Sequence, residues 1–303
     1  MGRRFLGEFA LLMVAASWGF GFVAIKYVLG WMGPVTFLWT RFALSFVILA
    51  AIFPARILRA GRATVKAGAV IGFFLAIAYM PQTIAMEIAS VSTVAFLTGL
   101  YVVFVPLFQA VLLRTRPGAL SVCGALISVL GLGVLSLTPG GLRFGLGEAL
   151  ATLCAMGFAM HIITVGKFAP SQDPIAISAI QIGAAAVVTA AVGIPMEPLP
   201  GLLPLGVVAC FIYLTVVNSV AATFIQNWAQ QVTQPTQAAL LLAMEPVFGA
   251  VASCVLLGER IGAKGIVGDA LIFCGMIMSQ VDSVRPRVVH REKEGNARCM
   301  TSS

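Results

Sequence analysis

Residues 91–113 read VSTVAFLTGLYVVFVPLFQAVLL and contain no charged side chain. A helix needs about 20 consecutive apolar residues to cross the hydrocarbon core of a bilayer, so this run is long enough to cross it once. The whole chain has the same character, since 60% of its 303 residues are apolar and only 10% are charged. Soluble domains carry about 25% charged residues. The composition therefore excludes a disordered chain, a secreted disulfide scaffold and an ordinary soluble enzyme.

Similar apolar runs, separated by glycine, proline and charged residues, recur along the chain and predict ten membrane-spanning helices. We expect these helices at residues 9–29, 34–54, 67–86, 91–113, 119–138, 147–167, 174–194, 205–227, 236–257 and 265–282. The charge-free run that begins at Pro198 is too long for one helix. We divide it before Pro235, because the residue that precedes a proline disfavours the helical conformation. The predicted fold is therefore an all-α polytopic membrane protein with ten transmembrane helices.

Basic residues are distributed unevenly between the two sides that ten spans define. The side that carries both termini receives Arg3, Arg4, Arg56, Arg59, Arg62, Lys66, Arg114, Arg116, Lys167, Arg285, Arg287, Arg291, Lys293 and Arg298. The other side receives Lys26, Arg143, Arg260 and Lys264. Because basic residues concentrate in cytoplasmic loops, both termini are predicted to be cytoplasmic, in the inner (plasma) membrane. This distribution accounts for the net charge of +8, and without a basic, aromatic stripe no nucleic-acid partner is expected.

Three pairs of short motifs recur at similar spacing and indicate an internal repeat. The pairs are Gly19-Phe20 with Gly157-Phe158, Pro106-Leu107-Phe108 with Pro246-Val247-Phe248, and Leu126-Ile127 and Gly131 with Leu271-Ile272 and Gly275. Five helices per copy is an odd number, so the second copy enters the membrane from the opposite side, as in alternating-access transporters. We therefore expect two inverted five-helix repeats, at residues 1–140 and 141–284. A basic cytoplasmic tail, 285–303, is expected to be disordered.

Polar and aromatic side chains within the predicted spans are candidates for a substrate pathway, because a polar group in hydrocarbon is costly unless it faces a cavity or a partner. The candidates are Trp18, Arg41, Tyr79, Gln82, Tyr101, His161, Asn218, Gln226, Trp228 and Glu245. Helix packing or an interhelical hydrogen bond is the alternative role for each of them. The chain has no phosphate-binding loop and no hydrolase or metalloprotease motif. No enzymatic activity, cofactor or metal is expected.

Two charged candidates have the most specific interpretations. Glu245 near the middle of the ninth span either contacts a substrate amine or carries a proton, or it hydrogen-bonds to backbone groups freed by Pro246. Arg41 in the second span either contacts substrate, or it snorkels or fixes helix packing. Asn218 and Gln226 are eight residues apart, which is about two helical turns, so we expect them to share one face of the eighth span.

Closely spaced glycines predict faces on which helices approach each other. The pairs are Gly68 with Gly72, Gly19 with Gly21, and Gly131 with Gly133. Small residues at such positions allow two backbones to come close in a membrane. We interpret these faces as packing and sliding surfaces.

Several motifs are distinctive, namely Ser17–Phe22 (SWGFGF), Arg41-Phe42, and residues 85–93 (AMEIASVST) leading into Pro106-Leu107-Phe108. The most specific stretch runs from Trp228–Val232 (WAQQV) through Leu240–Phe248 (LLLAMEPVF) to Leu256–Arg260 (LLGER), and continues to Gly268 and Leu271-Ile272. Through them, residues 9–282 resemble the EamA-type branch of the drug/metabolite transporter superfamily. One departure is the end of the fourth span, which carries Arg114-Thr115-Arg116 where the second copy has Glu259.

The resemblance implies secondary transport, usually export, of small metabolites such as amino acids, nucleosides and some vitamins. We therefore predict an exporter of small metabolites such as amino acids that works by alternating access in a lipid bilayer. Protons are a candidate coupling ion, and uncoupled transport is equally compatible with the few ionisable groups. Two alternatives are a multidrug or lipophilic-cation efflux protein, in which Glu245 pairs with the cation, and a membrane scaffold or enzyme subunit that transports nothing.

Overall fold

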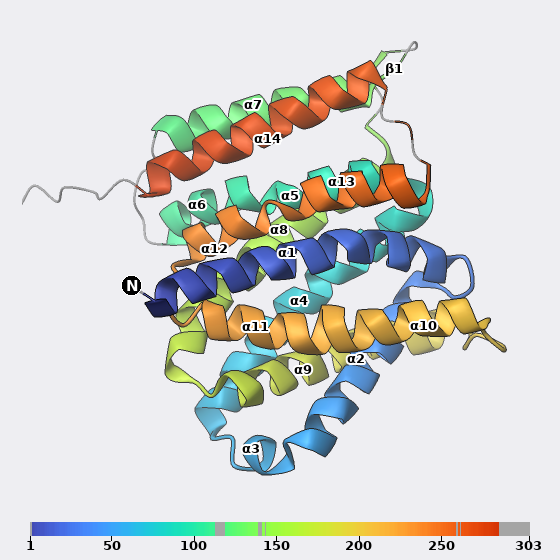
Figure 1. Ribbon diagram of the computed structural model, residues 1–303, viewed down its shortest axis with the longest axis vertical. Helices are drawn as coiled ribbons and strands as arrows, with labels where there is room; N and C mark the ends of the chain where they lie inside the picture. Colours follow the sequence, from blue (N-terminus) through green and yellow to red (C-terminus); the bar gives the residue numbers. More distant parts are fainter. Residues whose placement is uncertain are drawn as a thin grey trace, which may run out of the picture.

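A computed structural model describes residues 2–112, 119–138, 141–142, 144–258, 260 and 262–284. Over these residues the protein is a bundle of helices with one pair of two-residue antiparallel strands (Figure 1). The elements are α1 (Gly2–Leu29), α2 (Pro34–Ile52), α3 (Pro54–Leu58), α4 (Arg62–Ile88), α5 (Val91–Gly99), α6 (Tyr101–Leu112), α7 (Ala119–Ser136), β1 (Leu137–Thr138), β2 (Gly141–Leu142), α8 (Leu146–Phe168), η1 (Ala169–Ser171), α9 (Pro174–Met196), α10 (Leu205–Tyr213), η2 (Leu214–Ala221), α11 (Ala222–Ala229), α12 (Pro235–Leu242), α13 (Glu245–Leu256) and α14 (Ala263–Val284). The predicted tail, 285–303, lies outside the described residues.

Eight helical segments in the described part of the chain are long and apolar enough to cross a membrane. They are Arg3–Leu29, Pro34–Ile52, Arg62–Ile88, Val91–Leu112, Leu146–Ser171, Pro174–Met196, Leu205–Ala229 and Gln237–Leu256. This confirms the prediction of a helical, polytopic membrane protein. α7 contains a shorter apolar stretch, Val122–Val134, and lies beside α14 along one edge of the bundle (Figure 1). The total of ten crossings stays a prediction.

Three of these segments are interrupted within the membrane. The segment of α12 and α13 breaks at Ala243 and Met244, and α13 begins at Glu245 with Pro246 in its first turn. Proline favours the first turn of a helix, because a backbone N–H at that position would have no intrahelical partner and its absence loses no hydrogen bond. Glu245 therefore lies at a helix N-terminus, although the sequence places it near the middle of a span. The segment of α5 and α6 breaks near Leu100, and η2 is a π-helical insertion between α10 and α11.

Glycines mark the places where helices meet most closely. A methyl group on Gly72 of α4 would overlap the carbonyl oxygen of Gln181 on α9, and one on Gly157 of α8 would lie 2.8 Å from Ala78 Cα on α4. α4 therefore packs closely against both α8 and α9. Close approach is confirmed for all the predicted glycines except one, because a methyl group on Gly133 would meet nothing within 4 Å.

One end of the bundle, which we call the terminal end, carries the N-terminus. There Gly7 packs against Val232, which follows α11. The neighbouring Gln231 donates hydrogen bonds to the carbonyl oxygens of Ala169 and Gln172, at 3.1 and 2.9 Å. Since Gln172 precedes Asp173, which pairs with Arg56 at 2.6 Å, these contacts place Arg56 at the same end as the N-terminus, as the predicted topology requires.

At the opposite end, charged side chains bind helix termini. Glu197 after α9 accepts hydrogen bonds from the backbone N–H groups of Val35 and Thr36, at 3.2 and 2.7 Å. Lys26 of α1 donates to the carbonyl oxygen of Ala89 at 3.3 Å. A carboxylate suits the positive N-terminus of a helix and a cation suits its negative C-terminus. Arg56, which follows α2, and Glu197, which follows α9, therefore connect these two helices at opposite ends of the pair.

Asp173→Ala is expected to lower the free energy of unfolding by about 1 kcal/mol at pH 7, the usual effect of removing an N-cap. The Asp173 carboxylate accepts the N–H groups of Ile175 and Ala176, at 2.8 and 3.0 Å, and pairs with Arg56. Burial raises the pKa of Asp173, but the hydrogen bonds from Ala176, Ile175 and Arg56 outweigh it and hold the pKa below its usual value.

The contribution of Asp173 is therefore fully present above the ordinary aspartate pKa of about 3.9 and is lost as the pH falls through the lowered pKa. Thermal unfolding in detergent between pH 7 and pH 3 measures the difference between Asp173→Ala and the parent. Asp173→Asn is the control, because it keeps the cap and loses only a half-exposed ion pair, which contributes little. A difference that does not shrink in acid would contradict this account.

Candidate substrate site

Arg41 lies fully buried at the centre of a polar cluster. Its Nε donates to Ser219 Oγ at 2.6 Å and its Nη2 donates to Asn218 Oδ1 at 3.0 Å. Three ring centroids lie 5.3–5.7 Å from its guanidinium carbon, those of Tyr79, Phe37 and Phe42. Among the residues that the structure describes, Arg41 forms no ion pair, and its Nη1 has no partner with hydrogen-bond geometry, although the Tyr79 hydroxyl lies near the guanidinium. Arg41 therefore does not snorkel, and it retains an unused donor in the core.

A π-helical segment presents both partners of Arg41. η2 has wider turns than an α-helix, and Ser219 Oγ donates to the carbonyl oxygen of Leu214, five residues earlier, at 3.0 Å. Consecutive residues of an α-helix point about 100° apart, yet Asn218 and Ser219 both bind the same guanidinium. π-Helical turns within α-helices are frequent at functional sites.

Trp18 and Asn218 connect α1 to this cluster. Trp18 Nε1 donates to the carbonyl oxygen of Asn218 at 2.9 Å, and Asn218 Nδ2 donates to the carbonyl oxygen of Ser17 at 2.9 Å. Gly21 permits the contact, because a methyl group there would overlap the Asn218 amide. The structure thus brings together three predicted residues, Trp18, Arg41 and Asn218.

A row of edge-to-face aromatic rings extends from Arg41 toward α6 and α8. The Tyr79 ring lies 5.5 Å from Phe42 and 5.0 Å from Phe158, and Phe158 lies 6.4 Å from both Tyr101 and His161. The Tyr101 hydroxyl and both ring nitrogens of His161 are buried without a hydrogen-bond partner. The row places three more predicted residues together and leaves polar atoms that a ligand can bind.

Glu245 approaches the same row from α13. Its side chain is 6% exposed and lies within electrostatic range of Tyr79, Tyr101 and Cys154. The positive end of α13 favours a carboxylate at this position. In the described part of the chain, no hydrogen bond joins the Glu245 side chain to the backbone near Pro246, so the structure does not support that predicted alternative.

Gln82, in the C-terminal half of α4, lies next to the same region. Its Nε2 donates to Thr98 Oγ1 at 3.3 Å, and Thr98 Oγ1 lies 3.6 Å from Cys154 Sγ. Cys154 is the thiol within range of Glu245. Arg41 and Glu245 therefore both interact electrostatically with Tyr79. Gln82, Thr98 and Cys154 supply further buried groups that can hydrogen-bond.

Two stretches of the chain, residues 5–137 and 145–280, match the model of the EamA-like transporter family. The chain belongs to the EamA-like transporter family. It is 25% identical over 276 residues to an uncharacterized transporter of Archaeoglobus fulgidus, a match that covers 91% of this chain and 86% of that protein. A protein of known crystal structure shares the fold, with a TM-score of 0.66 and 19% identity over 93% of this chain and 97% of that one. The protein is a multi-pass membrane transporter.

Two predicted residues of this EamA-like transporter lie apart from the central group. Gln226 is buried and Trp228 is half-buried on α11, and no hydrogen bond or ring contact in the described residues joins either one to Arg41 or Glu245. The argument that Asn218 and Gln226 share a face assumes 3.6 residues per turn. Asn218 lies within η2, which has wider turns, so that argument does not apply.

The sequence prediction missed several residues that take part in this site, and one buried carboxylate on α14 of the transporter. Ser219, Phe42 and Phe158 take part in the contacts above, but a lone serine or phenylalanine in an apolar span carries no signal. Asp269 on α14 is different. It is buried with its Oδ1 unpartnered, and a carboxylate within the predicted tenth span was a visible signal.

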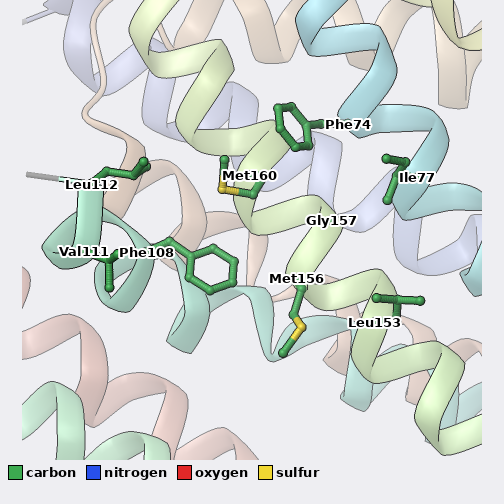
Figure 2. A pocket seen from close by; sticks show the side chains of 9 residues that line it. All are labelled: Phe74, Ile77, Phe108, Val111, Leu112, Leu153, Met156, Gly157 and Met160. Atoms are coloured by element: carbon green, nitrogen blue, oxygen red, sulfur yellow. The ribbon is translucent and has the colours of Figure 1, made fainter.

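An open apolar groove with a volume of about 350 Å³ lies between α4, α6 and α8 (Figure 2). Its lining consists of Phe74, Ile77, Phe108, Val111, Leu112, Leu153, Met156, Gly157 and Met160. Val111 and Leu112 at its rim are exposed, so the groove opens on the outside of the bundle. A surface of this composition suits lipid acyl chains, and it contains none of the predicted site residues.

Proposed function

We propose that this transporter exports small metabolites, most of all amino acids, from the cytoplasm across the inner (plasma) membrane by alternating access. Both termini are cytoplasmic, and the two family-matched halves act as inverted five-helix repeats. The observation that carries the proposal is that two buried groups of opposite charge, Arg41 and Glu245, both lie within Coulombic range of Tyr79 and form no ion pair in the described residues. A zwitterion can place its carboxylate at the unused Nη1 of Arg41, in a charge-assisted hydrogen bond, and its ammonium near Glu245.

The aromatic row supports a substrate with a large apolar part. The Phe158 ring packs edge to face against the rings of Tyr79 and Tyr101, at centroid distances of 5.0 and 6.4 Å. An apolar or aromatic substrate side chain gains contact area and ring interactions there. The unpartnered Tyr101 hydroxyl and His161 nitrogens add polar contacts. Phenylalanine, tyrosine and tryptophan are therefore the first substrates to test.

Counterflow in proteoliposomes tests this proposal. Purified protein is loaded with an unlabelled mixture of amino acids and exposed to single labelled amino acids and nucleosides, with protein-free liposomes as the control. Saturable exchange of amino acids supports the proposal. Exchange of nucleosides alone contradicts the substrate class, and no exchange by folded protein contradicts the transport role of the site.

Lipophilic-cation efflux is the second candidate, because Glu245 forms no ion pair in the described residues and has aromatic neighbours. Arg41 counts against it, since its buried positive charge shares the site and repels a cation. Tetraphenylphosphonium distinguishes the two candidates. A cation exporter exchanges it, whereas an amino-acid exporter does not.

Glu245→Gln is expected to abolish the response of transport to a pH gradient, because glutamine cannot bind and release a proton. Counterflow at equal pH on both sides is expected to continue at a lower rate, because glutamine keeps a hydrogen-bond acceptor for the substrate ammonium but loses the negative charge. Both are measured in the same proteoliposomes, with and without an imposed gradient. Glu87→Gln, which changes an exposed carboxylate at the end of α4, is the matched control and should keep the response. An unchanged response in folded Glu245→Gln would exclude Glu245 as the proton carrier.

A further inference from the structure

Four amide side chains are buried on α9 and at the C-terminal end of α11, in the half of the bundle nearest the terminal end. Each is at most 1% exposed and has at least one nitrogen or oxygen without a hydrogen-bond partner. The members are Gln181, Gln226, Asn227 and Gln230. We call this group the amide seam.

Two hydrogen bonds hold the amide seam closed. Asn227 Nδ2 on α11 donates to Ser178 Oγ on α9 at 2.8 Å, and Gln230 Nε2 donates to the Ile162 carbonyl oxygen on α8 at 3.3 Å. Gln181 is three residues after Ser178 on α9, and its backbone packs against Gly68 and Gly72 of α4. Gln226 is one turn before Gln230, and so it lies on the same face of α11.

The amide seam continues into the candidate substrate site. Ile162, which accepts the bond from Gln230, directly follows His161. The His161 ring lies 6.4 Å from Phe158 in the aromatic row, and both its nitrogens are unpartnered. The amide seam therefore contacts α8 one residue after the unpartnered His161, on the terminal side of the aromatic row.

Helix packing does not account for these groups. Both polar atoms of the Gln181 amide, Nε2 of Gln226, Oδ1 of Asn227 and Oε1 of Gln230 have no partner, whereas nearly all buried polar atoms in proteins are paired. A purely structural contact is cheaper with apolar side chains of similar shape, as at the contact of Gly157 with Ala78. Water or a polar solute between the helices would satisfy every one of these atoms.

We propose that the amide seam is the terminal-end half of the translocation path, in its closed state. Movement of α11 away from α8 and α9 opens a passage to Arg41 and Glu245. Its lining is polar, so it admits small polar solutes, zwitterions included. This inference rests on the proposed function, in which the terminal end faces the cytoplasm and the passage is the entry route.

Cysteine accessibility tests this path. Gln226→Cys and Gln230→Cys are made singly in protein whose six native cysteines are replaced, and a charged methanethiosulfonate reagent is added from the terminal side. The matched control is Ile177→Cys. Ile177 adjoins Ser178 at the same depth but is buried in an apolar cluster with Ile71 and Val165. We expect both seam cysteines to react at least tenfold faster than the control. Reaction no faster than the control overturns the proposal.

A second variant tests the movement and does not depend on labelling. In Ser178→Cys combined with Asn227→Cys, a disulfide should lock α11 to α9, stop counterflow of the amino-acid mixture, and release it on reduction. Unchanged counterflow after complete crosslinking overturns the path while leaving the proposed function intact. Absence of counterflow in the parent protein contradicts the proposed function instead, and the accessibility result then decides the path by itself.

Discussion

Arg41→Ala is expected to reduce the rate of amino-acid exchange about a hundredfold. The change removes a buried charge that has two hydrogen bonds and one unused donor, and with it the proposed contact to the substrate carboxylate. Truncating one partner of a buried, hydrogen-bonded charge pair costs about 2–5 kcal/mol, and about 2.8 kcal/mol corresponds to a hundredfold. Counterflow of labelled amino acids into proteoliposomes measures the effect.

Two further variants separate binding from folding. Arg41→Lys keeps the positive charge but loses the planar fork that holds Asn218 and Ser219 together, so it should retain a small part of the exchange. Ser219→Ala removes one hydrogen bond to Arg41 and leaves the charge, so it should exchange at a rate near that of the parent. If folded Arg41→Ala exchanges amino acids at the parent rate, Arg41 has only a structural role.

Gly72→Leu is expected to cause the largest loss of stability, about 3 kcal/mol or more. Overpacking a close contact typically costs 1–3 kcal/mol, and here the first atom to be met is backbone. A side chain at Gly72 would overlap the Gln181 carbonyl oxygen and would approach Ala184 Cβ to 2.7 Å. A backbone carbonyl cannot rotate away, so α4 and α9 must separate.

Gly133→Leu on α7 is the matched control, because a methyl group there meets nothing within 4 Å. Its midpoint of thermal unfolding in detergent should stay close to that of the parent, whereas that of Gly72→Leu should fall by many degrees or the variant should not fold. Equal midpoints for the two variants would contradict the packing of α4 against α9.

Much of the fold could be predicted because each span depends on consecutive residues of the sequence. Hydrocarbon must be matched by apolar residues, so the spans were located within a few residues. The break at Ala243 and Met244 was not predicted, because Glu245 lies inside a continuous apolar span of the sequence. The place of Pro246 in the first turn of α13 is evident only once α12 is known to end at Leu242.

The candidate site was predicted in part. Arg41, Trp18 and Asn218 stand out because polar groups in a membrane need partners, and the structure brings them together. Ser219 could not be predicted, because its role depends on the wider turns of η2, and no residue type in Leu214–Ala221 signals a π-helix. Phe158 was assigned only to the repeat, since its contacts with Tyr79 and Tyr101 join three separate helices.

The hydrogen bonds of Arg41 also have a consequence for the insertion of α2 into the membrane during synthesis. Its partners lie 177 and 178 residues later in the chain, and at 5–20 residues per second a ribosome needs roughly 9–36 s to reach them. During this interval α2 must enter the bilayer with its guanidinium unmatched, at a cost of about 2.5–3.5 kcal/mol. The ten Leu, Ile, Phe and Val residues of Pro34–Ile52 contribute about 3–6 kcal/mol in return. The net free energy of inserting α2 alone is therefore only slightly favourable, so the helix can insert before Asn218 and Ser219 are synthesised.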